Sequence, residues 1–167
     1  MIPSDHFVRF YNEVFKALET RGREHLVAYW RELGRLQSLV LAERFRTGGL
    51  QAAYDYWQVI FKEENCRGHA KLTEDCLELR LDYCPSLSKV LDNDAAPCRS
   101  YCDHCMGWVE PVMERAGLYA AHDIESRTEP HCSLRVFRRR EDAAAFEAQA
   151  RLLCRPYDDA PPATPAS

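Results

Sequence analysis

The chain lacks a long hydrophobic run, a basic excess and an internal repeat, and each absence argues against a class of protein. No apolar stretch in the 167 residues approaches the ~20 needed to cross a bilayer, so we expect no membrane span. A formal net charge of -4 leaves no cationic surplus for a phosphate backbone, so we expect no nucleic-acid partner. The first residues have neither the basic start nor the apolar stretch of a secretory signal. We therefore expect a cytoplasmic protein.

Cysteine, in contrast, is abundant: the chain has eight. This is about one residue in twenty, which falls short of the fraction in small secreted disulfide scaffolds. In a reducing compartment thiols persist as thiols, and clustered cysteines there usually bind metal or do chemistry. We therefore interpret the cysteines as ligands or reactive groups rather than as a disulfide framework.

Helical periodicity dominates the first third of the chain. Apolar residues recur at three- and four-residue spacing from residue 5 to about residue 65. Gly22 and the pair Gly48-Gly49 divide this region into three expected helices, of which the second covers 24–45 and the third about 50–64. Their aromatic residues are expected to form core, or else to roof an apolar pocket: Tyr29, Trp30, Tyr54, Tyr56 and Trp57.

The rest of the chain mixes strands and helices. Leu77, Leu79 and Leu81 alternate with charged residues, which predicts a strand at 76–84 with a partner at 69–73. A short helix at 86–91, a turn at 92–94 and a helix at 97–116 should follow. Strands at 122–127 and 131–139 and a helix at 141–154 complete the pattern.

These elements predict one α+β domain over residues 1–157, helical in 5–65 and mixed in 66–157. N-terminal helices should pack with a small antiparallel sheet, and one cysteine-bearing helix should lie between two strand pairs. Residues 158–167, rich in Pro and Ala, are expected to be a disordered tail.

The spacing of Cys98, Cys102 and Cys105 places the three thiols on one face of the predicted helix 97–116. Converging thiolates hold iron–sulfur clusters, our first choice of cofactor, or zinc, our second choice. Cys84 or Cys132 would supply a further metal ligand. The alternative is that the three cysteines are small core residues on an amphipathic helix.

Three titratable side chains near predicted strand ends are candidates for proton transfer: His131, His122 and Asp123. A metal-free enzyme would instead use Cys132 or Cys102 as nucleophile, with His131 or His122 as base. Adjacent His131 and Cys132 should point to opposite faces of their strand, which argues against their working as a pair.

The remaining cysteines and one histidine receive no chemical role. Cys66, Cys76 and Cys154 lie away from the cluster pattern, and we interpret them as structural. His104 lies between two candidate ligands, but its helical position points it away from their face. We therefore expect it on the surface.

Three segments carry a family resemblance: LDYCP at 81–85, SYCDHC at 100–105 and SRTEPHCSLRVF at 126–137. In this order they resemble the L-2-amino-thiazoline-4-carboxylic acid hydrolase-like family over about residues 72–137. The resemblance implies helices packed on an antiparallel sheet and hydrolytic opening of a cyclic amidine. Cys84, Cys102 and Cys132 match the family's positions, whereas Cys105 stands where relatives often have an acidic residue.

Together these observations predict a small enzyme in which a cysteine-ligated metal or cluster acts as Lewis acid. Its reaction would be hydrolysis of a C–N bond in a small heterocyclic or amide substrate. Two other functions remain open. One is a non-catalytic sensor or ligand-binding domain with a structural zinc. The other is an iron–sulfur electron-transfer protein.

Overall fold

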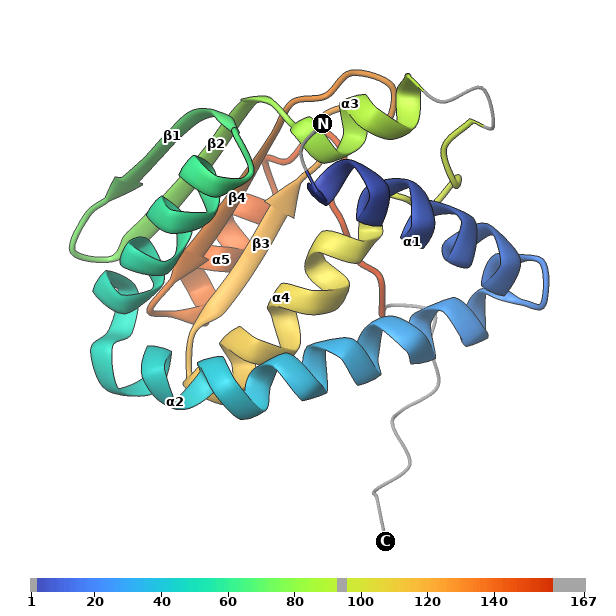
Figure 1. Cartoon of the computed structure of the whole chain (residues 1–167). Coiled ribbons are helices and arrows are strands. Elements are labelled where there is room, and N and C mark those ends of the chain that lie inside the picture. Colours follow the sequence, from blue (N-terminus) through green and yellow to red (C-terminus); the bar gives the residue numbers. More distant parts are fainter. Residues whose placement is uncertain (1–2, 93–95, 158–167) are drawn as a thin grey trace, which may run out of the picture.

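A four-stranded antiparallel sheet separates two unequal layers of helices (Figure 1). The computed structural model describes residues 3–92 and 96–157, and the α+β class expected from the sequence is confirmed. The elements are α1 (Pro3–Glu19), α2 (Arg23–Glu63), β1 (Arg67–Leu72), β2 (Cys76–Tyr83), α3 (Pro85–Leu91), α4 (Asp103–Ala116), β3 (Tyr119–Asp123), β4 (Cys132–Phe137) and α5 (Arg140–Glu147).

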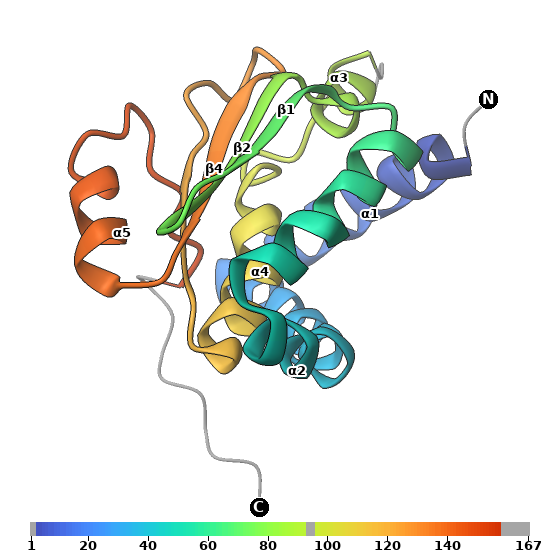
Figure 2. The same ribbon diagram turned by 90° about the vertical axis from the view of Figure 1, so that its left-hand side faces the viewer.

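The sheet has the strand order β1-β2-β4-β3. The alternation predicted for 76–84 is confirmed in β2, where Leu77 and Leu79 are buried opposite Val136 and Leu134 of β4. This face packs against the layer of α1, α2 and α4, while α5 covers the opposite face (Figure 2). The main core therefore lies between the sheet and the N-terminal helices.

The predicted break between the second and third helices falls inside α2. Helical structure continues through Gly48, but Gly49 has φ 59° and ψ -147°, a left-handed φ that glycine tolerates best. The helix bends there. Of the predicted core aromatics, Trp30 is fully buried and the other four pack partly buried against the same core, so the core interpretation is confirmed.

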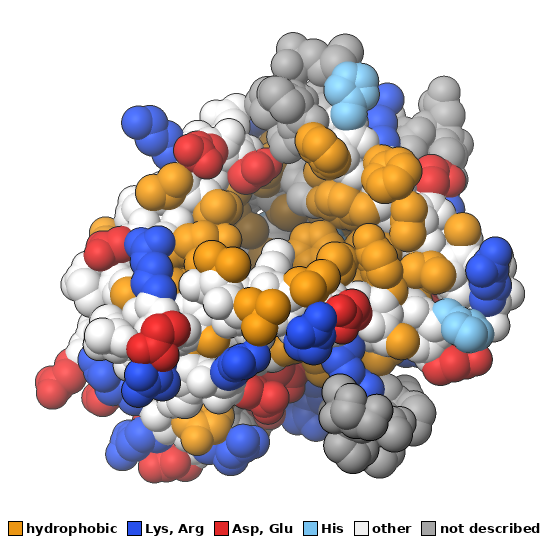
Figure 3. Space-filling model, turned by 60° about the horizontal axis from the view of Figure 1, so that its bottom comes forward, with side chains coloured by type: hydrophobic (Ala, Val, Ile, Leu, Met, Phe, Trp, Pro, Cys, Tyr) orange, Lys and Arg blue, Asp and Glu red, His pale blue; other side chains and the backbone are white. Residues whose placement is uncertain are grey.

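The outer side of α2 remains partly apolar. Leu36, Leu39 and Val40 are 45%, 56% and 75% exposed, and hydrophobic side chains are interspersed with charged ones on this side of the molecule (Figure 3). The ion pairs Glu32–Arg35 and Glu43–Arg46 each join residues three positions apart on α2. No helix in the described part of the chain is long and apolar enough to cross a membrane.

The cysteine-bearing helix is shorter than predicted. It was expected from residue 97, but α4 begins at Asp103 and residues 99–102 form turns. The preceding segment is tied to α1, because the buried Asn12 side chain donates to the Ala96 carbonyl and accepts from the Cys98 N–H. The predicted end is confirmed: Gly117 follows Ala116 with a left-handed φ of 76°.

Several other boundaries also differ from the prediction. The position predicted for the strand at 122–127 was wrong, because β3 covers Tyr119–Asp123. The Asp123 carboxylate accepts the N–H groups of Arg151 and Leu152. The strands expected at 69–73 and 131–139 are Arg67–Leu72 and Cys132–Phe137, and the helix expected at 141–154 is Arg140–Glu147. The predicted tail, 158–167, and most of the predicted turn at 92–94 lie outside the described residues.

Candidate functional site

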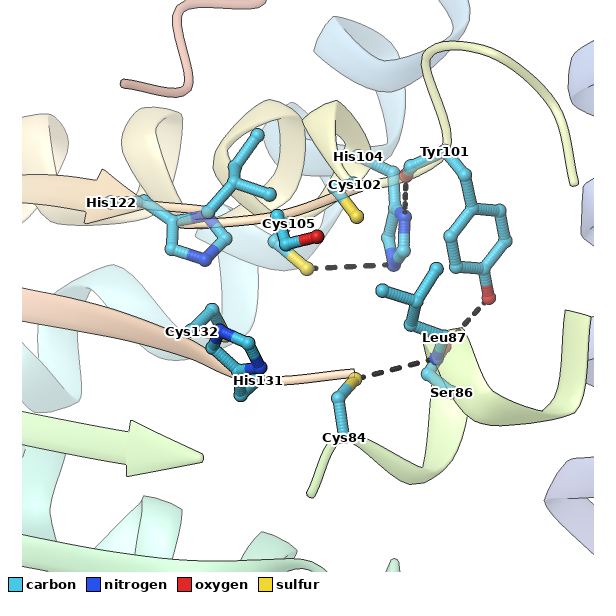
Figure 4. Close-up of a pocket in the computed structure, with 12 residues that line it drawn as sticks. Cys84, Ser86, Leu87, Tyr101, Cys102, His104, Cys105, His122, His131 and Cys132 are labelled. Carbon is cyan, nitrogen blue, oxygen red and sulfur yellow. Dashed lines mark hydrogen bonds between the residues drawn. The ribbon is translucent and has the colours of Figure 1, made fainter. Parts of the chain in front are cut away.

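A small pocket lies where the first turns of α3 and α4 meet the ends of β3 and β4 (Figure 4). Its cavity volume is about 30 Å³, more than the ~10–15 Å³ that a cavity needs to hold one water molecule. Thiols and imidazoles dominate the wall: Cys84, Cys102, Cys105, Cys132, His104, His122 and His131. Four cysteines from three separate segments of the sequence therefore share one cavity.

The local structure explains how these thiols meet. Cys84 follows β2 and caps α3, its sulfur accepting the Leu87 N–H at 3.4 Å. Cys132 begins β4 opposite Leu81 of β2. Cys102 immediately precedes α4 and Cys105 lies in its first turn. Strand order and the late start of α4 together bring the four sulfurs to the cavity.

Cys98, a predicted metal ligand, does not line this pocket. Because α4 begins only at Asp103, the three cysteines of the motif do not share a helix face. The Cys98 thiol instead donates to a carboxylate oxygen of Glu19 at 3.4 Å. The predicted convergence of Cys98 with Cys102 and Cys105 is therefore wrong.

His104 was expected on the surface, but it is buried in the pocket wall, 4% exposed. Its Nδ1 bonds the Tyr101 carbonyl oxygen. Since a carbonyl can only accept, Nδ1 carries the proton and Nε2 presents its lone pair toward Cys105 Sγ, 3.7 Å away. An imidazole held by a backbone carbonyl in this way is typical of metal-binding histidines.

A sequence signal for burial of His104 was available. Tyr101 and Trp108 stand three positions before and four after it, and their ring centroids lie 4.9 and 4.6 Å from the imidazole. Flanking aromatics at helical spacing indicate the buried face of a helix. The prediction considered only the face that carries the cysteines, and His104 lies off that face.

His122 is 2% exposed and neither ring nitrogen has a hydrogen-bond partner among the described residues. Burial, with the nearby charges of His104 and Arg127, lowers its pKa to about 4, and burial likewise lowers the pKa of His104 to about 4. Both rings are therefore neutral at pH 7. Leaving a buried polar group without a hydrogen bond costs about 1–3 kcal/mol. A ligand that bonded a ring nitrogen of His122 would remove this cost.

His131 lies at the rim, with its side chain 26% exposed. Its Nε2 is 3.6 Å from a carboxylate oxygen of Glu125, which also binds Arg80. The expectation that His131 and Cys132 point to opposite faces was wrong, because β4 starts at Cys132 and strand alternation does not extend to His131.

Asp123, a predicted proton-transfer residue, lies outside the pocket. Its carboxylate accepts the N–H groups of Glu125, Arg151 and Leu152. Burial opposes ionisation, but these hydrogen bonds outweigh it and lower the pKa of Asp123. The residue fixes the chain after β3, and through it the position of Glu125.

The pocket thiols are strongly held in their neutral form. Burial raises the pKa of Cys102 to about 12, and it raises the pKa of Cys84, Cys105 and Cys132 as well. For Cys105 the nearby charge of Cys84, Cys132 and Cys102 adds to the effect. Thiols of this kind are poor nucleophiles at pH 7, whereas a bound cation reverses the preference and displaces their protons.

The donor set suits a soft metal ion, but the present side-chain positions do not form a finished site. Among the described residues no group of three Cys, His, Asp or Glu side chains is placed to hold an ion. Coordination would require the thiols to turn about their Cα–Cβ bonds toward a common point. The sulfurs of Cys84, Cys102 and Cys105 already face the space between α3 and α4 (Figure 4).

The other three cysteines lie apart from the cavity wall. Cys154 is buried with its sulfur 3.9 Å from the Cys102 carbonyl oxygen, Cys76 packs on the α5 side of the sheet, and Cys66 precedes β1.

No protein-family model matches the chain, and no curated protein or solved structure matches it either.

Proposed function

We propose that the pocket binds a single soft metal ion, zinc in the first instance, and that the ion serves a hydrolase acting on C–N bonds. The observation that carries the proposal is the composition of the cavity: four thiols, with His104 and His122 each offering a ring nitrogen without a strong partner. Thiolate and imidazole are the ligands that zinc prefers. A reducing compartment, where thiols stay available, belongs to this proposal.

The cavity size favours one ion over an iron–sulfur cluster. A volume of about 30 Å³ suits a single atom, whereas a cluster brings several iron and sulfide atoms and would push the walls apart. The raised pKa of Cys102 and the other pocket thiols also weakens the metal-free alternative, in which Cys102 or Cys132 would be the nucleophile.

When bound, the ion would supply Lewis acidity toward a small heterocyclic or amide substrate at the pocket mouth. His131 is the residue best placed to move the proton, since it lies at the rim within 3.6 Å of Glu125. Glu125 would orient the imidazole through this contact. His122 and His104, being neutral and buried, fit the role of ligand better than that of base.

Metal analysis tests the first part of the proposal. Wild-type chain purified under reducing conditions in zinc-supplemented buffer, then desalted, should retain about one zinc per chain. Cys105→Ser and Cys132→Ser should lose the metal, because a hydroxyl is a poor soft-metal ligand. Cys98→Ser and Cys76→Ser are matched controls outside the pocket and should keep it. A wild-type chain that holds no metal would contradict the proposal. Finding iron with acid-labile sulfide would show that the cofactor is an iron–sulfur cluster rather than zinc.

The catalytic part is tested by His131→Gln. The variant should keep its zinc, because His131 lies at the rim, yet ring opening of small cyclic amidines or amides should slow by about 10²- to 10⁴-fold. Product formation is followed by mass spectrometry. An unchanged rate would remove His131 from the reaction.

A structural zinc is the second candidate function, and the narrow cavity is the observation in its favour. Four closed thiolate ligands leave no position for substrate. This alternative predicts stoichiometric zinc and marked loss of stability on chelation, with no hydrolysis of any substrate in the screen.

A further inference from the structure

Cys66 precedes β1 and Cys84, one of the pocket thiols, follows β2 at the same end of this strand pair. Strands β1 and β2 are antiparallel, and their last paired residues at this end are Arg67 and Tyr83. The next residues outward on the two chains are Cys66 and Cys84. A register shift between Arg67 and Gly68 separates this last pair from the regular ladder. Continuing the pairing one residue outward places Cys66 opposite Cys84, and opposed residues of a regular antiparallel pair have Cα atoms about 4.5–5.5 Å apart, within the roughly 4.4–6.8 Å that a disulfide spans.

Cys66 and Cys84 are both half-buried free thiols. Burial is the main cause that raises the pKa of Cys66 to about 11, and the charge of Cys84 is the next. Cys66 does not line the metal pocket, so it is a neighbour of Cys84 that metal binding would leave free.

We propose that Cys66 and Cys84 form a reversible disulfide that withdraws Cys84 from the pocket and so releases the metal. The disulfide itself depends on the β1–β2 pairing alone, while its regulatory consequence rests on the metal site proposed above. Cys132 is a less suitable partner, because its register partner on β2 is Leu81, three residues before Cys84.

The chemistry requires a low-molecular-weight disulfide as oxidant, such as oxidised glutathione. One protein thiolate attacks a glutathione sulfur, the glutathione S–S bond breaks, and one glutathione thiolate leaves. The second protein thiolate then attacks the protein sulfur of the mixed disulfide and displaces the other glutathione. Two protein thiols are oxidised, one glutathione disulfide is reduced to two thiols, and the two protons end on glutathione.

Peptide mapping under non-reducing conditions tests the proposal on the full, metal-loaded chain. After incubation with oxidised glutathione, wild type should yield a peptide pair linked through Cys66 and Cys84 that disappears on reduction. The rate at which zinc is released into solution, followed with a coloured chelator, should be at least tenfold higher for wild type than for Cys66→Ser. Cys76→Ser, which alters a half-buried cysteine on the other face of the sheet, should behave as wild type.

The outcomes separate this proposal from the metal site. A linked peptide in a chain that holds no zinc would support the disulfide while the proposed function fails. Cys84 linked instead to Cys102 or Cys132, or left unlinked while other thiols are oxidised, would overturn the disulfide. Equal zinc release from wild type and Cys66→Ser would overturn its regulatory effect.

Discussion

Two buried imidazoles set the acid stability of the protein at the scale of single residues. His104 and His122 have their pKa lowered from 6.5 to about 4 in the folded chain, so the unfolded chain binds more protons between these values. Stability from this source is complete above about pH 6.5 and is lost as the pH falls toward 4. In metal-free protein each histidine should lower the unfolding free energy by on the order of 2 kcal/mol between pH 7 and pH 5.

Urea denaturation at several pH values measures this loss. His122→Phe removes one of the two groups and should reduce the slope of stability against pH by about half over this range. His69→Phe, at a histidine that is mostly exposed, should keep the wild-type slope. If His122→Phe also keeps the wild-type slope, His122 is solvated or partnered in the folded chain.

Only some of the pocket residues could be predicted from the sequence. The short spacing of Cys102 and Cys105 made them candidate ligands. Cys84, at a strand end, and Cys132, beside His131, were added as possible further ligands. Their meeting point depends on β4 lying between β2 and β3, which no local pattern encodes. Cys98 was included because a proline at residue 97 suggested a helix start six residues too early. His104 was excluded because it does not share a helix face with the cysteines.

At the scale of elements, α4 carries a proline in its interior. Pro111 has no N–H, so it cannot bond the Gly107 carbonyl four residues earlier. The Tyr157 hydroxyl donates to this carbonyl instead, at 2.5 Å. A side chain from the end of the described chain thereby replaces the missing helix hydrogen bond.

This arrangement predicts a non-additive pair of substitutions. Tyr157→Phe should destabilise by about 1–3 kcal/mol, because the Gly107 carbonyl is left without a donor. Pro111→Ala restores a backbone N–H that can bond that carbonyl, so adding Tyr157→Phe to this background should cost less. A double-mutant cycle of denaturation midpoints gives the coupling. Additive costs would show that the hydroxyl and the proline act independently.

Strands were predicted correctly where large apolar residues recur at a regular spacing in the sequence, and incorrectly where they do not. Leucines alternate with charged residues from Leu77 to Leu81 of the eight-residue strand β2, so both the strand and its buried face were predicted. β3 is short and contains Ala120 and Ala121, whose small side chains give little contrast between its faces. The strand was therefore assigned to later residues, although Asp123 holds the chain to Arg151 and Leu152 there.

At the scale of the whole molecule, contacts join segments from both ends of the described chain. Asn12 in α1 binds Ala96 and Cys98 ahead of α4, and the Cys154 N–H donates to the His122 carbonyl in β3. The core between the sheet and α1, α2 and α4 is continuous. Within the described residues, the N-terminal helices therefore share their core with the sheet and would lose it if the sheet unfolded.

We therefore expect the chain to unfold as one unit, in agreement with the single domain predicted from the sequence. Trp30 and Trp57 of α2 and Trp108 of α4 all pack in this core, so tryptophan fluorescence should change at the same urea concentration as helical circular dichroism. Trp30→Ala should shift both transitions together and cost about 3–5 kcal/mol, since the side chain is fully buried. Two separated transitions, with helical signal persisting after the fluorescence change, would mean that the N-terminal helices form a folding unit of their own.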